Sequence, residues 1–148
     1  MGQGSVEAAR HLAKEATAAF GPIDILVNNA GAFPFAPLEQ VSEADFDNTY
    51  AVNAKGPFFL TAALAPQMAE RGSGKVISIT TMVAHVGQPM ISLYGSTKAA
   101  LTLLTKSWAT EPGPKRINVN AIAPGPTYTP ATKGMGEGLE QLAATLPA

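Results

Sequence analysis

The fold is decided by the stretch GPIDILVNNAG, residues 21–31, in which a short apolar run lies between two groups of turn-forming residues. The run Ile23–Val27 is rich in apolar and β-branched residues, the pattern of a strand buried on both faces of a parallel sheet. Gly21-Pro22 ends a helix before it, and Asn28–Gly31 forms a turn after it. A helix followed directly by a buried strand predicts one repeat of an α/β fold.

The helix before this strand is predicted from the spacing of apolar residues. They recur at intervals of three and four, which places them on one face of a helix expected to run from Ser5 to Phe20. The residues on that face are Val6, Ala9, Leu12, Ala13, Ala16 and Phe20.

The remaining sequence continues the alternation of helices and strands. After the Pro-rich loop 33–37, Ser42 is a candidate helix cap with Asp45 three residues later. A long helical region follows and ends at Gly72, with a break expected at 53–57. Further elements are expected at 75–81 (strand), 93–109 (helix), 117–123 (strand) and, weakly, 137–146 (helix). We therefore predict a single α/β domain over residues 1–148, with a Rossmann-like doubly wound parallel sheet.

Composition argues against several classes of function. The formal net charge is −1 and like charges do not cluster, so we expect no nucleic-acid or membrane partner. The absence of cysteine excludes disulfides and cysteine nucleophiles and favours a reducing compartment, the cytoplasm. His11 and His85 have no ligand-spaced partners, so no metal site is expected. Neither an export signal nor a membrane-spanning run is predicted.

The segment Tyr94-Gly95-Ser96-Thr97-Lys98 is the first candidate for chemistry. It lies at the start of the predicted helix 93–109, where residues four apart share a face, so an ammonium group is expected beside a phenol. A nearby cation lowers the pKa of a phenol from about 10, which would let Tyr94 exchange a proton near neutral pH. The alternative is an aromatic residue and a lysine on a solvated helix face.

Thr81 is expected to lie near this pair. It ends the predicted strand 75–81, and ligands bind at strand ends in open α/β sheets. Two other hydroxyl groups compete with it. Ser78 is too far from Tyr94 by spacing, and Thr80 is expected to face the opposite side of the strand.

Five motifs stand in one order along the chain: Asn28-Asn29-Ala30-Gly31, Val52-Asn53-Ala54-Lys55-Gly56-Pro57-Phe58, Thr80-Thr81, Tyr94-Gly95-Ser96-Thr97-Lys98 and Asn120-Ala121-Ile122-Ala123-Pro124-Gly125-Pro126-Thr127. Together they are far more specific than any one alone. They resemble the short-chain dehydrogenase/reductase family, from about Ser5 to the C-terminus. The resemblance implies hydride transfer between a nicotinamide and a small ketone or secondary alcohol. Bacterial members that reduce 3-oxoacyl thioesters or similar ketones are an analogy for the substrate.

The resemblance also implies roles for four catalytic residues. Tyr94 corresponds to the proton donor toward a carbonyl, or the base toward an alcohol, and Lys98 lowers its pKa and holds the nicotinamide ribose. Asn53 matches a residue that orders a water relay to the lysine; alternatively, it satisfies backbone groups at a helix kink. Thr81 stands where the family usually has Ser, and it keeps the hydroxyl while its methyl group restricts the rotamer.

By the same resemblance, two turns contact the cofactor, NAD or NADP, between which the sequence does not choose. The first turn lines the adenosine side, and its alternative is a plain strand-ending turn with Gly31 at positive φ. The second turn, after the third strand, faces the nicotinamide. The candidate residues are Asn29, Ala30 and Gly31 in the first turn and Pro124, Gly125, Thr127 and Thr129 in the second.

Relative to the family, the first βαβ half with its Gly-rich phosphate-binding turn is missing from the sequence, and so is the last strand. Ile23–Val27 is therefore expected to be an exposed apolar edge. Two hypotheses remain open: an NAD(P)-dependent oxidoreductase, or a noncatalytic remnant or assembly module unable to bind cofactor. A homo-oligomer formed through the long helix and the Tyr94 helix is expected from the resemblance.

Overall fold

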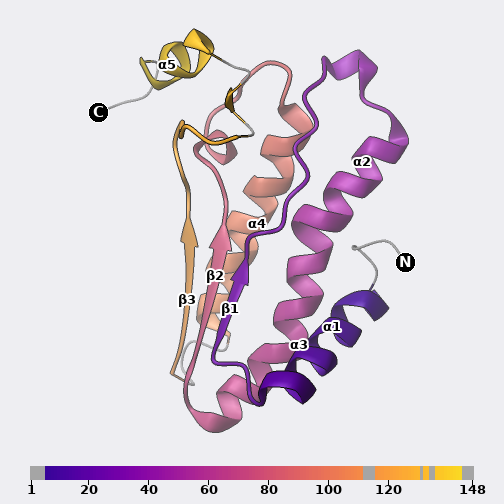
Figure 1. Ribbon diagram of the computed structural model, residues 1–148, viewed down its shortest axis with the longest axis vertical. Coiled ribbons are helices and arrows are strands. Elements are labelled where there is room, and N and C mark those ends of the chain that lie inside the picture. Colours follow the sequence, from indigo (N-terminus) through magenta and orange to yellow (C-terminus); the bar gives the residue numbers. More distant parts are fainter. Residues whose placement is uncertain (1–5, 112–115, 131, 134–135, 145–148) are drawn as a thin grey trace.

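The computed structural model describes residues 6–111, 116–130, 132–133 and 136–144, in which helices and strands alternate as expected (Figure 1). Ser5 and Leu146, the outer ends of the first and last expected helices, lie outside these residues. The strands are β1 (Ile25–Asn28), β2 (Gly74–Ile79) and β3 (Ile117–Ile122). The helices are α1 (Val6–Phe20), α2 (Glu43–Tyr50), α3 (Gly56–Arg71), α4 (Ser92–Thr110) and α5 (Glu137–Ala144). None of the helices in this part of the chain is both long and apolar enough to cross a bilayer.

The three strands form one parallel sheet in the order β1-β2-β3. The register places Leu26 beside Val76 and Val76 beside Val119, so these three side chains point to the same face. Parallel strands joined through helices confirm the predicted Rossmann-like α/β class.

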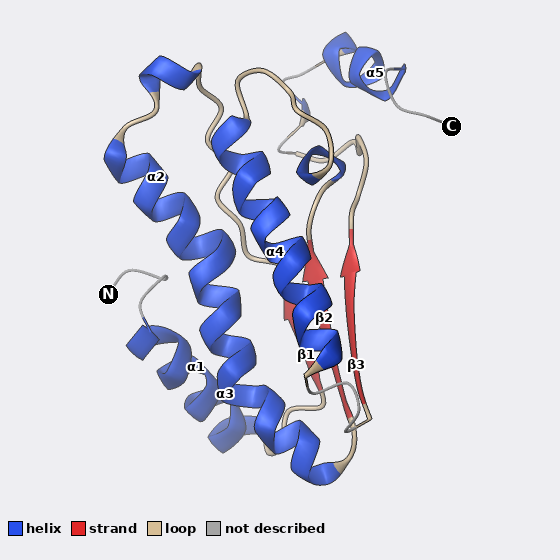
Figure 2. Cartoon of the chain, turned by 180° about the vertical axis from the view of Figure 1, so that it is seen from behind, coloured by secondary structure: helices blue, strands red, loops and turns tan. Residues whose placement is uncertain are grey.

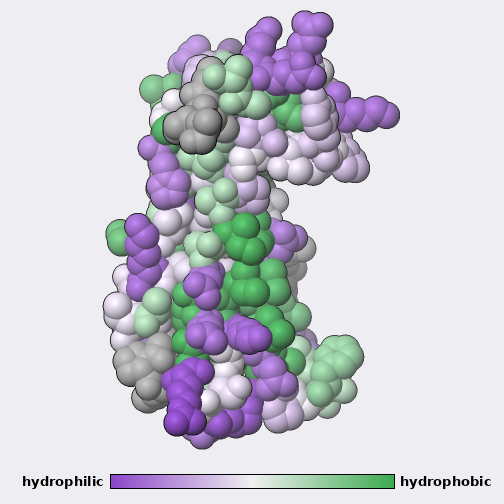
Figure 3. Space-filling model, turned by 90° about the vertical axis from the view of Figure 1, so that its left-hand side faces the viewer, coloured by the Kyte–Doolittle hydropathy of each residue, from purple (hydrophilic) through white to green (hydrophobic). Residues whose placement is uncertain are grey.

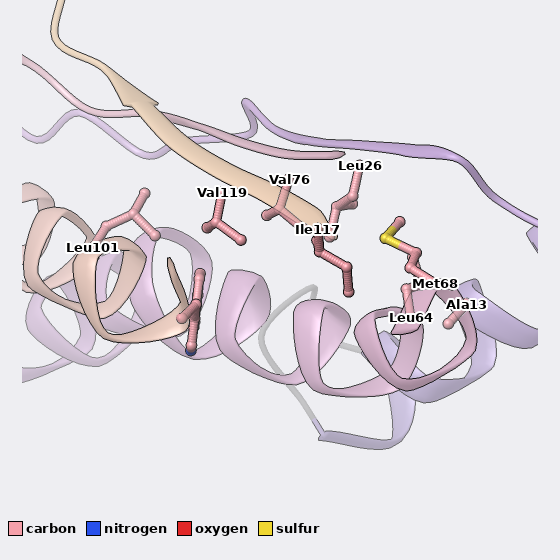
Figure 4. Close-up of a cluster of buried hydrophobic side chains, with 9 residues drawn as sticks. Ala13, Leu26, Leu64, Met68, Val76, Leu101, Ile117 and Val119 are labelled. Carbon is pink, nitrogen blue, oxygen red and sulfur yellow. The ribbon is translucent and has the colours of Figure 1, made fainter. Parts of the chain in front are cut away.

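Helices α1, α3 and α4 lie on one side of the sheet, as the two opposite views show (Figures 1 and 2). Strand side chains on that side pack against helix side chains to form the core (Figure 4). The core residues are Ala13, Leu26, Leu64, Met68, Val76, Leu101, Trp108, Ile117 and Val119. Burial of this apolar surface fixes the helices on the sheet.

The expectation that the first strand is buried on both faces is wrong. Leu26 and Asn28 are buried, whereas Ile25 and Val27 are 52% and 50% exposed. The helices pack on one face only in the described residues, so alternate side chains of β1 reach the other, open face. Apolar side chains gather among polar ones on the strand side of the molecule (Figure 3). The expected edge position is confirmed, since β1 pairs with β2 alone among the described strands.

The long helical region is broken where the sequence predicted. Ser42 caps α2 by accepting a hydrogen bond of 3.1 Å from the Asp45 amide. A π-helical turn, Ala51–Lys55, joins α2 to α3, and Pro57 follows within the first turn of α3. Such turns place side chains differently from a regular helix and are frequent at functional sites.

Gly74, the first residue of β2, lies directly against the core. A Cβ atom built on it would come within 2.6–2.7 Å of the side chain of Met68, which is fully buried. We expect Gly74→Ala to lower the free energy of unfolding by about 1–3 kcal/mol through overpacking. Gly87→Ala is the control, because nothing lies within 4 Å of its added Cβ and its φ is not positive. Urea unfolding of both variants checks this, and an equal effect would contradict it.

Candidate active site

Thr81, Tyr94 and Lys98 lie at the carboxyl end of the sheet, where the first turns of α4 pack beside the end of β2 (Figure 1). Lys98, on α4, is 3% exposed and points toward the sheet. Its Nζ donates a hydrogen bond of 2.7 Å to the carbonyl oxygen of Ile79, the last residue of β2. This bond fixes the ammonium group at the strand end.

The Thr81 hydroxyl lies close enough to the Tyr94 phenol to act on its pKa as a hydrogen-bond partner. Thr81 lies two residues beyond the end of β2, rather than within the strand as predicted, and its hydroxyl also accepts from the Val83 amide at 3.4 Å. This extended residue caps the short 3₁₀ helix Met82–Ala84. Two hydroxyl groups from separate elements therefore converge at one point.

The two rival hydroxyl groups are engaged elsewhere. Thr80 donates to the Ile122 carbonyl on β3 at 3.1 Å. Ser78 is fully buried beneath α4 and accepts from Thr105 at 2.9 Å. Their positions agree with the preference for Thr81, which is the hydroxyl that reaches Tyr94.

Burial, more than charge, sets the proton affinity of the site. Desolvation raises the pKa of Tyr94 above its ordinary value of 10.0, while the Thr81 hydrogen bond opposes this shift. Burial also lowers the pKa of Lys98. The expected lowering of the Tyr94 pKa by Lys98 is therefore not found. The ammonium group is turned to the Ile79 carbonyl and lies 5.9 Å from the centre of the tyrosine ring.

Asn53 is fully buried in the π-helical turn and holds two other segments of the chain. Its Oδ1 accepts from the Ala32 amide at 2.7 Å, and its Nδ2 donates to the Ala32 carbonyl at 2.9 Å. The same Nδ2 donates to the Thr97 hydroxyl at 2.9 Å, one residue before Lys98. Asn53 thus satisfies backbone groups of the turn after β1 instead of those of its own helix kink.

Gly31 lies between Asn53 and Lys98. A Cβ atom at this position would be 3.5 Å from both Asn53 Oδ1 and Lys98 Nζ. The alternative with Gly31 at positive φ is wrong, since the described glycines with positive φ are Gly21, Gly72 and Gly136. Because Gly31 has no side chain, its backbone is left uncovered beside the polar groups of Asn53 and Lys98.

A cavity of about 410 Å³ opens beside the turn that follows β1. Its lining includes Asn29 and Ala30, residues of β1 and of the π-helical turn, and apolar residues of α1 and α3 such as Leu12, Pro57 and Leu60. The size and the mainly apolar lining suit a flat organic group held by a few polar contacts.

The loop after β3 reaches the same end of the sheet only in part. The Pro124 carbonyl accepts from the Met82 amide at 3.1 Å, next to Thr81. Thr127 instead donates to the Gly125 carbonyl at 3.0 Å. Thr129 bonds with Thr132, so the recorded hydrogen bonds of these two threonines stay within the loop.

Two residues of the site were missed by the sequence analysis. The Thr97 hydroxyl accepts a hydrogen bond from the Asn53 side-chain amide. Phe33 packs edge-on against the Tyr94 ring, with the two ring centroids 4.6 Å apart. Thr97 lies three residues after Tyr94, inside the segment Tyr94–Lys98, which is the signal that could have identified it. Phe33 lies in the Pro-rich loop, where no spacing rule predicts a contact. No group of three His, Asp or Glu side chains able to hold a metal ion occurs in the residues that the structure describes.

The hydrogen bonds from the Asn53 side chain to Ala32 and Thr97, here called the Asn53 clamp, make the fold sensitive to one substitution. Asn53→Ala removes the partner of both backbone groups of Ala32 and the donor to the Thr97 hydroxyl, which keeps its bond to the Tyr94 carbonyl. We therefore expect a loss of about 2–4 kcal/mol in the free energy of unfolding. Asn48→Ala is the matched control, because Asn48 is exposed on α2. Chemical denaturation of the two variants measures the difference. If Asn53→Ala were as stable as Asn48→Ala, the clamp would not be structural.

Known proteins resemble this chain in sequence along most of its length. The family model described as short chain dehydrogenase matches residues 4–140. An uncharacterized oxidoreductase of Thermotoga maritima is 42% identical over 121 residues, which cover 82% of this chain and 48% of that protein. A 3-oxoacyl-acyl-carrier-protein reductase of the same organism is 38% identical over 80% of this chain and 48% of its own length.

Solved structures give the same result. A gluconate 5-dehydrogenase from Burkholderia cenocepacia, in complex with NADP and tartrate, superposes with a TM-score of 0.85 at 33% identity, over 93% of this chain and 54% of that chain. An NAD⁺-bound xylitol dehydrogenase superposes with a TM-score of 0.81 at 31% identity, over 99% of this chain and 56% of that chain. The chain therefore spans about half the length of the relatives that it matches.

Proposed function

The chain belongs to the short-chain dehydrogenase family, and on that premise we propose that it carries the catalytic residues of an NAD(P)-dependent oxidoreductase. The proposal depends above all on the adjacent hydroxyl groups of Tyr94 and Thr81 at the strand end, with the ammonium group of Lys98 beside them. Relatives solved with NADP or NAD⁺ bound support the cofactor class. The substrate is a small ketone or, in reverse, a secondary alcohol.

The two hydroxyl groups have complementary tasks in carbonyl reduction. A substrate oxygen placed between them accepts a hydrogen bond from each, which stabilises the negative charge that develops there. A nicotinamide cofactor, when bound, would supply the hydride for the carbonyl carbon. Tyr94 gives its phenolic proton to the oxygen, and Lys98, 5.9 Å from the ring centre, is the nearby cation for the tyrosinate that results.

The residues present fit a nicotinamide cofactor at two places. The cavity beside Asn29 and Ala30 has the apolar lining and the polar rim that a flat base needs. Lys98 and Tyr94 hold donors at the strand end, where a ribose would be bound. Gly31, between these places, lets a ligand approach the backbone closely. Asn53 would act by positioning α4 and the turn after β1. We also propose that it orders a water relay to Lys98.

The first test compares the chain with its Tyr94→Phe variant. We expect the melting temperature of both to rise with NADH or NADPH concentration, because a ligand that binds only the folded state stabilises it. Ketone reduction by Tyr94→Phe should be slower by about 10² to 10⁴. Because burial raises the Tyr94 pKa, reduction should persist at neutral pH, while alcohol oxidation should increase as the pH approaches and passes 10.0.

The contrary outcomes separate the alternatives. Equal reduction rates for the two chains would show that Tyr94 is not the proton donor. A melting temperature that does not change with either cofactor, in a folded sample, would favour the noncatalytic assembly module. Far-ultraviolet circular dichroism of both chains is the control for folding.

A homo-oligomer formed through the α2–α3 region and α4 is the second part of the proposal. Apolar side chains on these helices remain exposed: Phe46 on α2, Phe58 on α3 and Leu103 on α4. Tyr50, on α2, donates to Ser96 on α4 at 3.1 Å, so the two helices present a joined surface. Apolar groups gathered on such a surface are typical of an interface.

Light scattering after size-exclusion chromatography tests this interface. We expect the wild-type chain to elute as an oligomer and Leu103→Glu to shift it toward the monomer, because a carboxylate at an apolar interface is costly to desolvate. Leu38→Glu is the control, since Leu38 is also exposed but lies outside these helices. An oligomer that survives Leu103→Glu unchanged would place the interface elsewhere.

A further inference from the structure

One exposed aromatic ring lies next to Tyr94, and a second lies beside the first. Phe33 and Phe35, in the loop after β1, are 54% and 61% exposed. The ring of Phe33 meets that of Tyr94 at 85°, with centroids 4.6 Å apart, and Phe35 lies 6.5 Å from Phe33. Single exposed apolar residues are ordinary, but contiguous rings beside a reactive hydroxyl group form a surface that can receive a ligand.

The loop that carries these rings is held at both ends. Both backbone groups of Ala32, directly before Phe33, are bound to the Asn53 side chain. The Ala36 amide, directly after Phe35, donates to the Met90 carbonyl at 2.9 Å. Met90 has a φ of 70°, a strained conformation for a residue with a side chain, which persists only where the surroundings impose it. The rings are therefore presented in a fixed place, with the half-exposed Met90 beside their loop.

We propose that Phe33 is a specificity-determining residue and selects ketones that carry an apolar aryl or alkyl substituent. The inference rests on the proposed function, because it assumes that the reacting carbonyl lies between Tyr94 and Thr81. The substituents of such a carbonyl extend only a few ångströms from the Tyr94 ring, against which Phe33 packs. Its ring offers no hydrogen-bond donor to a hydroxylated substituent, whereas an aryl group packs on it edge-to-face or offset.

Direct binding measurements test the proposal without requiring turnover. The probes are acetophenone, an aryl ketone, and hydroxyacetone, a small polar ketone, titrated against the chain by saturation-transfer NMR with and without oxidised cofactor. We expect acetophenone to bind more tightly. Phe33→Ala should weaken the binding of acetophenone on the order of 10-fold and change the affinity for hydroxyacetone by less than about twofold. Phe33→Leu, which keeps an apolar side chain, should recover part of the affinity for acetophenone.

Phe20→Ala is the matched control, since it removes the same ring from an exposed site, 84% accessible, at the end of α1. It should leave both affinities unchanged. The proposal is overturned if acetophenone does not bind, if it binds no more tightly than hydroxyacetone, or if Phe33→Ala and Phe20→Ala give the same affinities.

A parallel assay of ketone reduction separates this proposal from the proposed function. Preferred binding of acetophenone that depends on Phe33, without turnover with either cofactor, would support the apolar site and contradict the oxidoreductase. Turnover could instead depend on Tyr94 while Phe33→Ala keeps the same preference for acetophenone as the wild-type chain. That result would support the oxidoreductase and contradict the role of Phe33.

Discussion

The buried amide of Asn53 joins three segments that are distant in the sequence, and the candidate site depends on it. One side chain binds both backbone groups of Ala32 and the hydroxyl of Thr97, so the turn after β1, the π-helical turn and α4 are fixed relative to one another. A fully buried amide is stable only when its polar atoms are paired, and here both are. The π-helical turn is what places this side chain inward at the point where the other two segments meet.

Lys98 shows the cost of building a polar site at the end of a packed sheet. A buried ammonium group loses hydration, which is why its pKa is lowered, and the Ile79 carbonyl replaces part of that hydration. The same desolvation raises the pKa of Tyr94, so the phenol keeps its proton at neutral pH. A protonated phenol can act as a donor toward a carbonyl. The packing that buries α4 against the sheet therefore also favours the proton-donating form of Tyr94.

The sheet of the described chain has two unlike faces. One carries the core, with Leu26, Val76 and Val119 against the helices, and the other leaves Ile25, Val27 and Ile122 exposed. Parallel sheets are usually covered on both faces, because their strands are apolar on both sides. The chain spans about half the length of its relatives, and the described helices cover one of these faces.

The sequence by itself determined the alternation of helices and strands, the break near Asn53 and the Ser42 cap. These features follow from spacing, turn residues and strand alternation, which are local properties of the chain. Tertiary structure decided that Asn53 binds Ala32 and Thr97, residues 21 and 44 positions away, and that Lys98 binds Ile79. It also decided that Phe33 meets Tyr94 and that the Tyr94 pKa rises. Hydrogen-bond partners and desolvation depend on which segments pack together, and no local pattern contains that information.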